Sequence, residues 1–264
     1  MNNERTHYRP GGRQPFFFYA LFGPSFADLQ VTEHRHRVTG IPGGIQFLTY
    51  DIRRDSETMT LYYSNQLGEL LREKGDELFR RVALSPACLV IVGEVSEDTG
   101  SLEYFRNMIG IVQAAVEQGA VAVLDAQTLR WYSAEEWSET FFAQSAIRPL
   151  DQTALLVTKE GEDVYKLHTR GMRKFGRPDL SIRQVPESGI PYATSLVNRL
   201  IELQADGERL QAASFVTWRE TDWSLVGTYN GDVANPEFNN ESVEYDYNPA
   251  WGKLDRNAEG AGWQ

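Results

Sequence analysis

The stretch CLVIVGEVSEDTGSLEYFRNMIGIVQAAVEQGAVAVLD, residues 88–125, decides the fold class. Its apolar run from Leu89 to Val95 predicts a buried strand. Apolar side chains recur at helical spacing from Leu102 to Gln118, and Gly119 stands where glycine often ends a helix. The run Val121 to Leu124 predicts a second buried strand. A strand, an amphipathic helix and a strand in this order predict a right-handed crossover whose two strands are parallel neighbours.

Outward from this unit, hydrophobic periodicity predicts further elements on both sides. The aromatic run Phe16 to Phe22 predicts a buried strand, and Gln66 to Val82 an amphipathic helix. Ser133 and Glu136 have the spacing of a capping box and predict the start of a short helix. The other expected elements are an antiparallel pair of Ile45–Ile52 with Met59–Tyr63, a hairpin of Ala154–Thr158 with Val164–His168, a strand over Ser181–Val185, a helix from Pro191 to Gln204, and a hairpin of Ala213–Trp218 with Trp223–Tyr229.

These elements together predict an α+β fold. We expect a mixed, mostly antiparallel sheet with one parallel strand–helix–strand crossover and helices packed on the sheet. No internal repeat and no proline-rich linker divides the chain. The sequence therefore predicts a flexible N-terminal arm over residues 1–14, a single body over residues 15–231, and an acidic, aromatic-containing tail over residues 232–264.

Composition restricts the classes of function. The chain has 264 residues, 41% of them hydrophobic, and a net charge of −11. That charge repels phosphate backbones and disfavours nucleic acid, whereas it suits a basic protein partner. The single cysteine, Cys88, excludes an intramolecular disulfide and four-cysteine metal sites. No segment approaches the roughly 20 apolar residues of a membrane span, so we expect a cytoplasmic protein that does not bind membranes.

Motifs for catalysis are weak, and we expect no catalytic residue, no cofactor and no metal. The phosphate-binding glycine motifs are absent. His34 and His36, with Glu33, have the spacing of metal ligands on a strand, but an exposed charged turn is the better interpretation. Ser25, Asp125 and His168 occur in the chain order of α/β-hydrolases, yet the turn lacks the glycine that follows such a nucleophile.

The most unusual segment is HTRGMRKFGRPD, residues 168–179, together with the preceding Lys166. Residues 166–177 contain five cations and no acid: Lys166, Arg170, Arg173, Lys174 and Arg177. An anionic ligand is one interpretation, because arginine forks bind carboxylates and phosphates, and a loop that pairs with the acidic body is the other. We expect Arg170 and Arg173 to contact an anion. The candidate ligand-binding residues are His168, Arg170, Arg173, Lys174 and Arg177.

The same segment, preceded by GAVAV at residues 119–123 and WYS at residues 131–133, carries a resemblance. It resembles an uncharacterised bacterial domain-of-unknown-function family with a Thr-x-Gly-Met/Leu-x-x-Phe-Gly-x-Pro-acid segment. The likeness covers roughly Cys88 to Gly207. It implies an accessory or immunity-like role in bacterial conflict systems, and it assigns no functional residue.

Aromatic residues of the expected tail are the candidate partner-binding residues: Phe238, Tyr245, Tyr247 and Trp251. A solvated tail has no use for these rings or for Trp263, so we expect several of them to be buried against the body or a neighbouring chain, with Trp251 as the main anchor.

Two hypotheses about function follow. The first is a non-enzymatic interaction or accessory protein, which binds another protein, possibly basic, or a second copy of itself through its acidic surface and its tail. The alternative is an enzyme or small-molecule binder that holds an anionic ligand with the His168–Arg177 loop.

Overall fold

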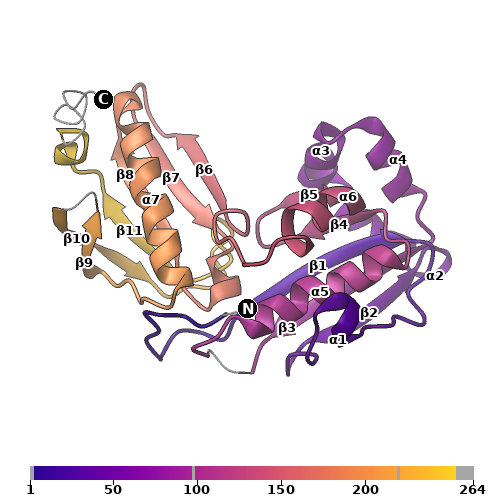
Figure 1. The fold of residues 1–264 in the computed structure, drawn as a ribbon. Helices are drawn as coiled ribbons and strands as arrows, with labels where there is room; N and C mark the ends of the chain where they lie inside the picture. The colour runs from indigo at the N-terminus through magenta and orange to yellow at the C-terminus, as the bar shows by residue number, and fades with distance from the viewer. Residues whose placement is uncertain (1–2, 97–98, 219–220, 254–264) are drawn as a thin grey trace, which may run out of the picture.

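The computed structural model describes residues 3–96, 99–218 and 221–253, and their strands form two sheets (Figure 1). The first sheet contains β1 (Phe16–Gly23), β2 (Gln46–Asp51), β3 (Ala87–Glu94), β4 (Ala122–Asp125) and β5 (Arg130–Ser133), and the second contains β6 (Ala154–Lys159), β7 (Tyr165–Arg170), β8 (Asp179–Val185), β9 (Ala213–Trp218), β10 (Thr221–Asn230) and β11 (Ser242–Asp246). The α+β class is confirmed. The strands are divided between two sheets, where one sheet was expected.

The first sheet has the spatial order β2-β3-β1-β4-β5. The aromatic strand β1 lies at its centre and pairs antiparallel with both β3 and β4. The prediction that β3 and β4 are parallel neighbours is therefore wrong: they point the same way, but β1 lies between them. The physical reason is that β1 is apolar on both faces, and such a strand is most stable at the centre of a covered sheet.

Helices cover both faces of the first sheet. The described helices are α1 (Glu33–His36), α2 (Ile52–Tyr62), α3 (Asn65–Glu73), α4 (Asp76–Ala83), α5 (Glu103–Glu117), α6 (Ala134–Trp137) and α7 (Ile190–Ala205), with π- or 3-10 turns η1 (Ser138–Phe142), η2 (Met172–Phe175), η3 (Glu187–Gly189) and η4 (Pro249–Lys253). Phe17, Tyr19 and Leu21 of β1 pack in one core cluster with α5. Ala20 and Phe22 point to the opposite cluster, which α2, α3 and α4 cover.

Two expected elements differ from the structure. Met59–Tyr63 was expected as a strand, but residues 59–62 lie in helix α2 and Tyr63 is its C-cap. Asp51 caps the start of this helix by accepting a hydrogen bond from the Arg53 N–H at 2.9 Å. The single helix expected over residues 66–82 is two helices, α3 and α4. They are separated at Gly75, whose φ of 118° does not fit a helix. The capping box of Ser133 and Glu136 is present.

The second sheet has the order β6-β7-β8-β11-β10-β9. The β6–β7 and β9–β10 hairpins and the helix α7 match the sequence-based expectation. Helix α7 lies across one face of this sheet (Figure 1), and its buried Leu196, Val197 and Leu200 belong to the same core cluster as Leu180 and Tyr245. That cluster also contains α5, so one core connects the two sheets.

Residues expected in the C-terminal tail complete the second sheet. Strand β11 lies between β8, to which it is parallel, and β10, to which it is antiparallel. The predicted end of the body at Gly231 is therefore wrong for these residues. Val243 and Tyr245 are buried and alternate with more polar neighbours, so the segment has strand periodicity over a length too short to stand out in an acidic region.

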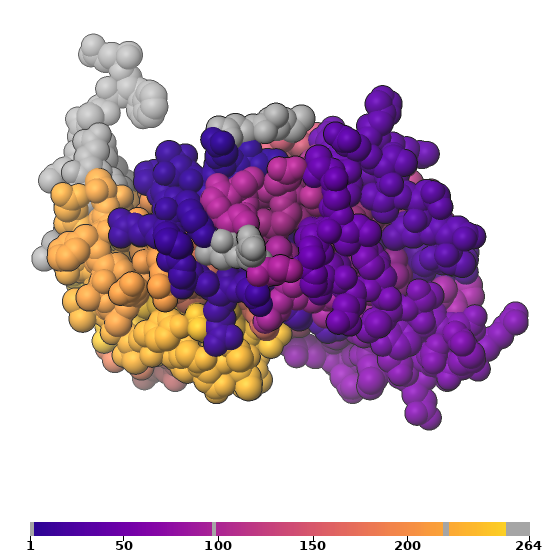
Figure 2. All heavy atoms as spheres, turned by 90° about the horizontal axis from the view of Figure 1, so that it is seen from below, coloured from indigo at the N-terminus to yellow at the C-terminus, as the bar shows by residue number. Residues whose placement is uncertain are grey.

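The N-terminal arm is also part of the folded body. Arg5 is buried, and its side chain donates hydrogen bonds to the carbonyl oxygens of Ala205, Gln204 and Phe175 at 2.9–3.2 Å. Figure 2 shows these first residues, in indigo, lying between the orange C-terminal half and the magenta central segment. The expectation of a flexible arm is wrong here because Arg5 satisfies the exposed carbonyls at the end of α7.

Candidate functional site

The cationic segment expected to bind a ligand lies at the junction of the two sheets. Lys174, on η2, is fully buried (0% exposed), and its Nζ donates to Asp125 Oδ2 at 2.5 Å and to Gln152 Oε1 at 3.4 Å. Burial lowers the pKa of Lys174, and the Asp125 carboxylate opposes that change. Because Asp125 ends β4 in the first sheet, the ion pair joins the sheets and presents no charge to solvent.

Two arginines of the segment bind main-chain oxygens. Arg177 donates to the carbonyls of Gly207, Glu208 and Arg9 at 2.8–3.1 Å. Arg170 donates to the carbonyls of Gln127 and Glu237 at 3.2 and 2.7 Å, and burial lowers its pKa. These guanidinium forks hold together loops that are far apart in the sequence.

Arg173 and His168 contact acidic side chains of this chain. Arg173 Nη2 lies 2.9 Å from Glu94 Oε1. His168 Nδ1 lies 3.7 Å from Glu237 Oε1, and burial lowers the imidazole pKa. The expected anion of Arg173 is thus an internal carboxylate, whereas the oxygens that Arg170 binds belong to carbonyl groups.

The candidate partner-binding aromatics are mostly internal. Phe238, Tyr245 and Trp251 are buried, and the rings of Tyr247 and Trp251 meet edge-on with centroids 5.3 Å apart. Burial of several of these rings, with Trp251 among them, is confirmed. Trp263 lies outside the described residues.

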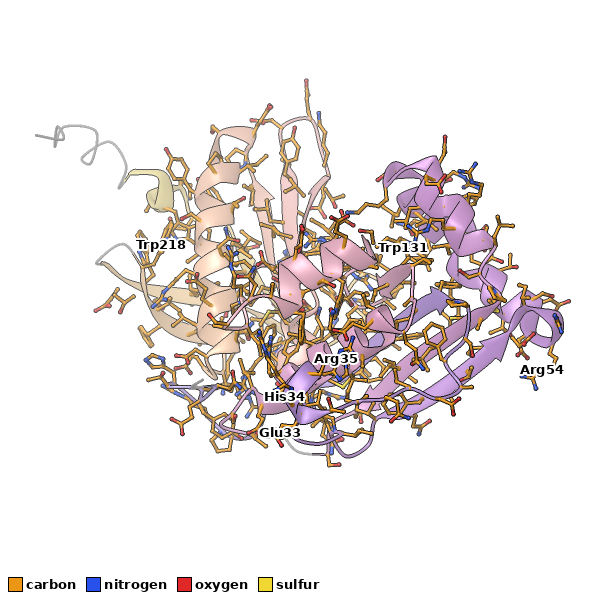
Figure 3. The ribbon with its side chains drawn as sticks, turned by 45° about the vertical axis from the view of Figure 1, so that its right-hand side comes forward. Glu33, His34, Arg35, Arg54, Trp131 and Trp218 are labelled. Atoms are coloured by element: carbon orange, nitrogen blue, oxygen red, sulfur yellow. The ribbon has the colours of Figure 1, made fainter. Side chains whose placement is uncertain are left out.

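The other candidate groups are not assembled into sites. On α1, His36 is buried and its Nδ1 accepts a hydrogen bond from the Thr32 N–H, whereas His34 is exposed. Figure 3 shows Glu33, His34 and Arg35 together on this short helix. The described residues contain no cluster of metal-ligating side chains. Ser25 is exposed, while Asp125 is paired with Lys174, so the hydrolase-like order of residues reflects no triad.

An exposed apolar patch lies at one edge of the second sheet. Phe215 on β9 is 84% exposed and Val226 on β10 is 71% exposed. In the β9–β10 register, Phe215 pairs with Ser224 and Ala213 pairs with Val226, so these side chains share one face. Val216 and Leu225 are buried on the opposite face. Sequence alternation identified the hairpin, but it could not tell which of its two apolar faces is covered.

A cavity of about 280 Å³ lies where five distant segments meet. It is lined by residues Gly11, Gly12 and Arg13 of the arm, Gly176, Arg177 and Pro178 before β8, Arg209, Leu210, Gln211 and Ala212 before β9, and by Tyr229 and Glu241. Only Arg177 belongs to the candidate residues of the cationic segment. The arm residues that complete the cavity carried no sequence signal beyond two adjacent glycines.

Some charged side chains of the cavity form ion pairs within the chain and others do not. Arg13 Nε forms an ion pair with Glu241 Oε1. Burial and a hydrogen bond with Glu241 raise the pKa of Tyr229 to about 12, so its hydroxyl stays protonated. Arg209 is exposed and forms no ion pair with any described carboxylate.

No helix among the described residues is long and apolar enough to cross a membrane. Comparisons with protein-family models, with curated proteins and with solved structures find no match to this chain.

Proposed function

We propose that this chain is a non-enzymatic accessory protein, immunity-like in role, that binds an extended basic segment of another protein in the bacterial cytoplasm. The observation that carries the proposal is the outer edge of β9. No described strand pairs with that edge, and β9 contains neither a charged residue nor a proline. Proteins usually protect edge strands with charges, prolines or bulges, because an open edge pairs readily with another chain. An unprotected edge is typical of a strand that receives a partner strand.

The main-chain groups available for pairing can be identified. The Gly227 N–H donates to the Ala212 carbonyl at 2.7 Å, so Ala212 faces β10. Because the main-chain groups of successive residues in a strand alternate in direction, those of Ala213, Phe215 and Thr217 face the outer edge. A partner strand would satisfy these groups.

Side chains add apolar contact beside that edge. Phe215 and Val226 are large, exposed and on one face of the hairpin. Covering each of them contributes about 1.5–3 kcal/mol. The aromatics Tyr245 and Trp251 offer no such surface, since they are buried in the chain itself. The proposed contact is therefore the β9–β10 hairpin, and the C-terminal segment supports it from within the sheet.

The net negative charge of the chain favours a basic partner. A net charge of −11 attracts basic segments and speeds their association, whereas it repels nucleic acid. A second copy of this chain carries the same charge and would meet repulsion, so a different, basic protein is the preferred occupant.

The test is quantitative affinity capture from cells with three variants. Phe215→Lys and Val226→Lys replace apolar contact with a charge that repels a basic partner, and we expect both to lose the same set of captured proteins. Leu84→Lys is the matched control, because Leu84 is 75% exposed at the end of α4, on the other sheet. It should retain the wild-type set.

Light scattering on the purified chain separates the alternatives. A monomer whose captured proteins depend on Phe215 agrees with the proposal. If the chain is a dimer that Phe215→Lys converts to a monomer, the edge receives a second copy and the basic-partner proposal fails. Capture of the same proteins by all three variants would also refute the basic-partner proposal.

A further inference from the structure

The cavity between the N-terminal arm and the second sheet has the properties of a binding site for a small organic anion. Its volume of about 280 Å³ is near the lower end of the roughly 300–1,000 Å³ of small-molecule sites. Its lining residues come from five segments that are far apart in the sequence, so the cavity forms only in the folded chain. Neither Phe215 nor Val226 lines the cavity, so a ligand there would leave both side chains uncovered.

Arg209 is the cation of the lining that could bind the anionic group of a ligand. Arg209 has no carboxylate partner among the described residues, although the chain carries an excess of acids. Its guanidinium lies against the main chain of the arm: a methyl group built on Gly11 would approach Arg209 Nη1 to 3.0 Å. Gly11 also has a φ of 89°, a conformation that favours glycine. The arm is shaped to leave room for this guanidinium.

Residues of the arm that line the cavity with Arg209 also carry main-chain donors. The N–H groups of Gly11, Gly12 and Arg13 form no hydrogen bond with any described acceptor. Successive free N–H groups next to an arginine fork form a common arrangement for binding anionic oxygens. The rest of the lining suits an apolar body, since Pro178, Leu210 and the ring of Tyr229 contribute hydrophobic surface.

The hydrogen-bond partners of the lining cations indicate the class of anion. The lining contains three arginines and one carboxylate: Arg13 pairs with Glu241, and the Arg177 guanidinium donates to main-chain carbonyls. Arg209 is the lining arginine whose guanidinium is left to bind a ligand, and one guanidinium fork matches one carboxylate. We infer that the cavity binds a small monocarboxylate with an apolar body, whose carboxylate accepts from Arg209 and from the N–H groups of the arm.

The experiment is isothermal titration of the full chain with benzoate, with hexanoate and with inorganic phosphate. We expect saturable binding of at least one carboxylate and much weaker binding of phosphate. Arg209→Gln should weaken carboxylate binding about tenfold or more, because hydrogen bonds to a charged group are lost. Gly11→Ala should weaken it too, since alanine disfavours the φ of 89° at this position and its methyl group would contact the guanidinium.

Arg54→Gln is the matched control. Arg54 is exposed on α2, at the opposite end of the molecule from Trp218 of β9 (Figure 3), and it does not line the cavity, so its loss should leave binding unchanged. Amide resonances of Gly11 and Gly12 should shift on titration and report binding at this place. No saturable binding of either carboxylate at 10 mM, which is on the order of the weakest specific affinities, would overturn the inference. Unchanged binding with Arg209→Gln, or a preference for phosphate, would overturn it equally.

Discussion

Replacing Lys174 with methionine tests whether the buried ion pair holds the two sheets together. The variant keeps the length of the side chain but leaves the Asp125 carboxylate, which is also buried, without its cation. Removing one partner of a buried pair costs about 3–5 kcal/mol, because the remaining charge is uncompensated. For a chain of this size, that loss lowers Tm by at least about 6 °C.

Lys74→Met is the matched control. Lys74 Nζ forms an ion pair with Glu136 at the same kind of distance, 2.9 Å, but both side chains are well exposed. Exposed pairs contribute about 0–1 kcal/mol, so the control should be nearly as stable as wild type. Urea unfolding followed by tryptophan fluorescence measures both variants, and equal midpoints would refute the reasoning.

A double variant identifies the cause of the loss. Asp125 Oδ1 accepts hydrogen bonds from the N–H groups of Gln127 and Thr128, and an asparagine retains that acceptor. Lys174→Met combined with Asp125→Asn should therefore be more stable than Lys174→Met alone, since the stranded charge is removed. If the double variant is less stable, packing around Lys174 rather than its charge accounts for the effect.

Three further outcomes are expected. Burial raises the pKa of Asp179 to about 6, so between about pH 4 and 6 the folded state holds a proton that the unfolded state has lost. The free energy of unfolding should therefore fall as the pH rises through this range, by at most about 3 kcal/mol. Asp179→Asn should flatten that slope, measured by urea unfolding at several pH values. Trp251→Ala should cost about 3–5 kcal/mol, measured by the same unfolding, because the ring is buried. Thr217→Pro should abolish partner capture while circular dichroism stays unchanged, since it removes an N–H that faces the outer edge of β9; retained capture would argue against strand pairing.

Local patterns predicted those parts of the fold whose periodicity extends over a full element. The helix α5 and the β6–β7 hairpin followed from spacing alone. The place of β1 between β3 and β4 did not, because strand order depends on the competition of all apolar strands for the centre of the sheet. The position of β11 was missed for a related reason. Five residues of alternation are too few to distinguish a strand from chance in the sequence, and the strand is defined only by its pairing with β8 and β10 in the fold.

The cationic segment shows why charge runs are ambiguous in a sequence. No acid lies among residues 166–177, which favours an external anion. The structure supplies their partners from far away: Asp125 for Lys174 and Glu94 for Arg173. Main-chain carbonyls at loop ends and at the end of α7 satisfy the remaining guanidinium groups, and such partners carry no residue type that a sequence could reveal.

Arg209, one of the described cations without a carboxylate partner, lies outside that run. Arg209 follows helix α7 and has acidic neighbours in the sequence, including Glu208, which suggests local neutralisation. In the fold, Glu208 pairs with Arg9 instead, and its carbonyl accepts from Arg177. The arm thus pairs with the carboxylate of the residue that precedes Arg209 in the sequence, and its Gly11 lies against the Arg209 guanidinium. The guanidinium of Arg209 is left available to an anionic ligand, which is the condition that the proposed carboxylate site requires.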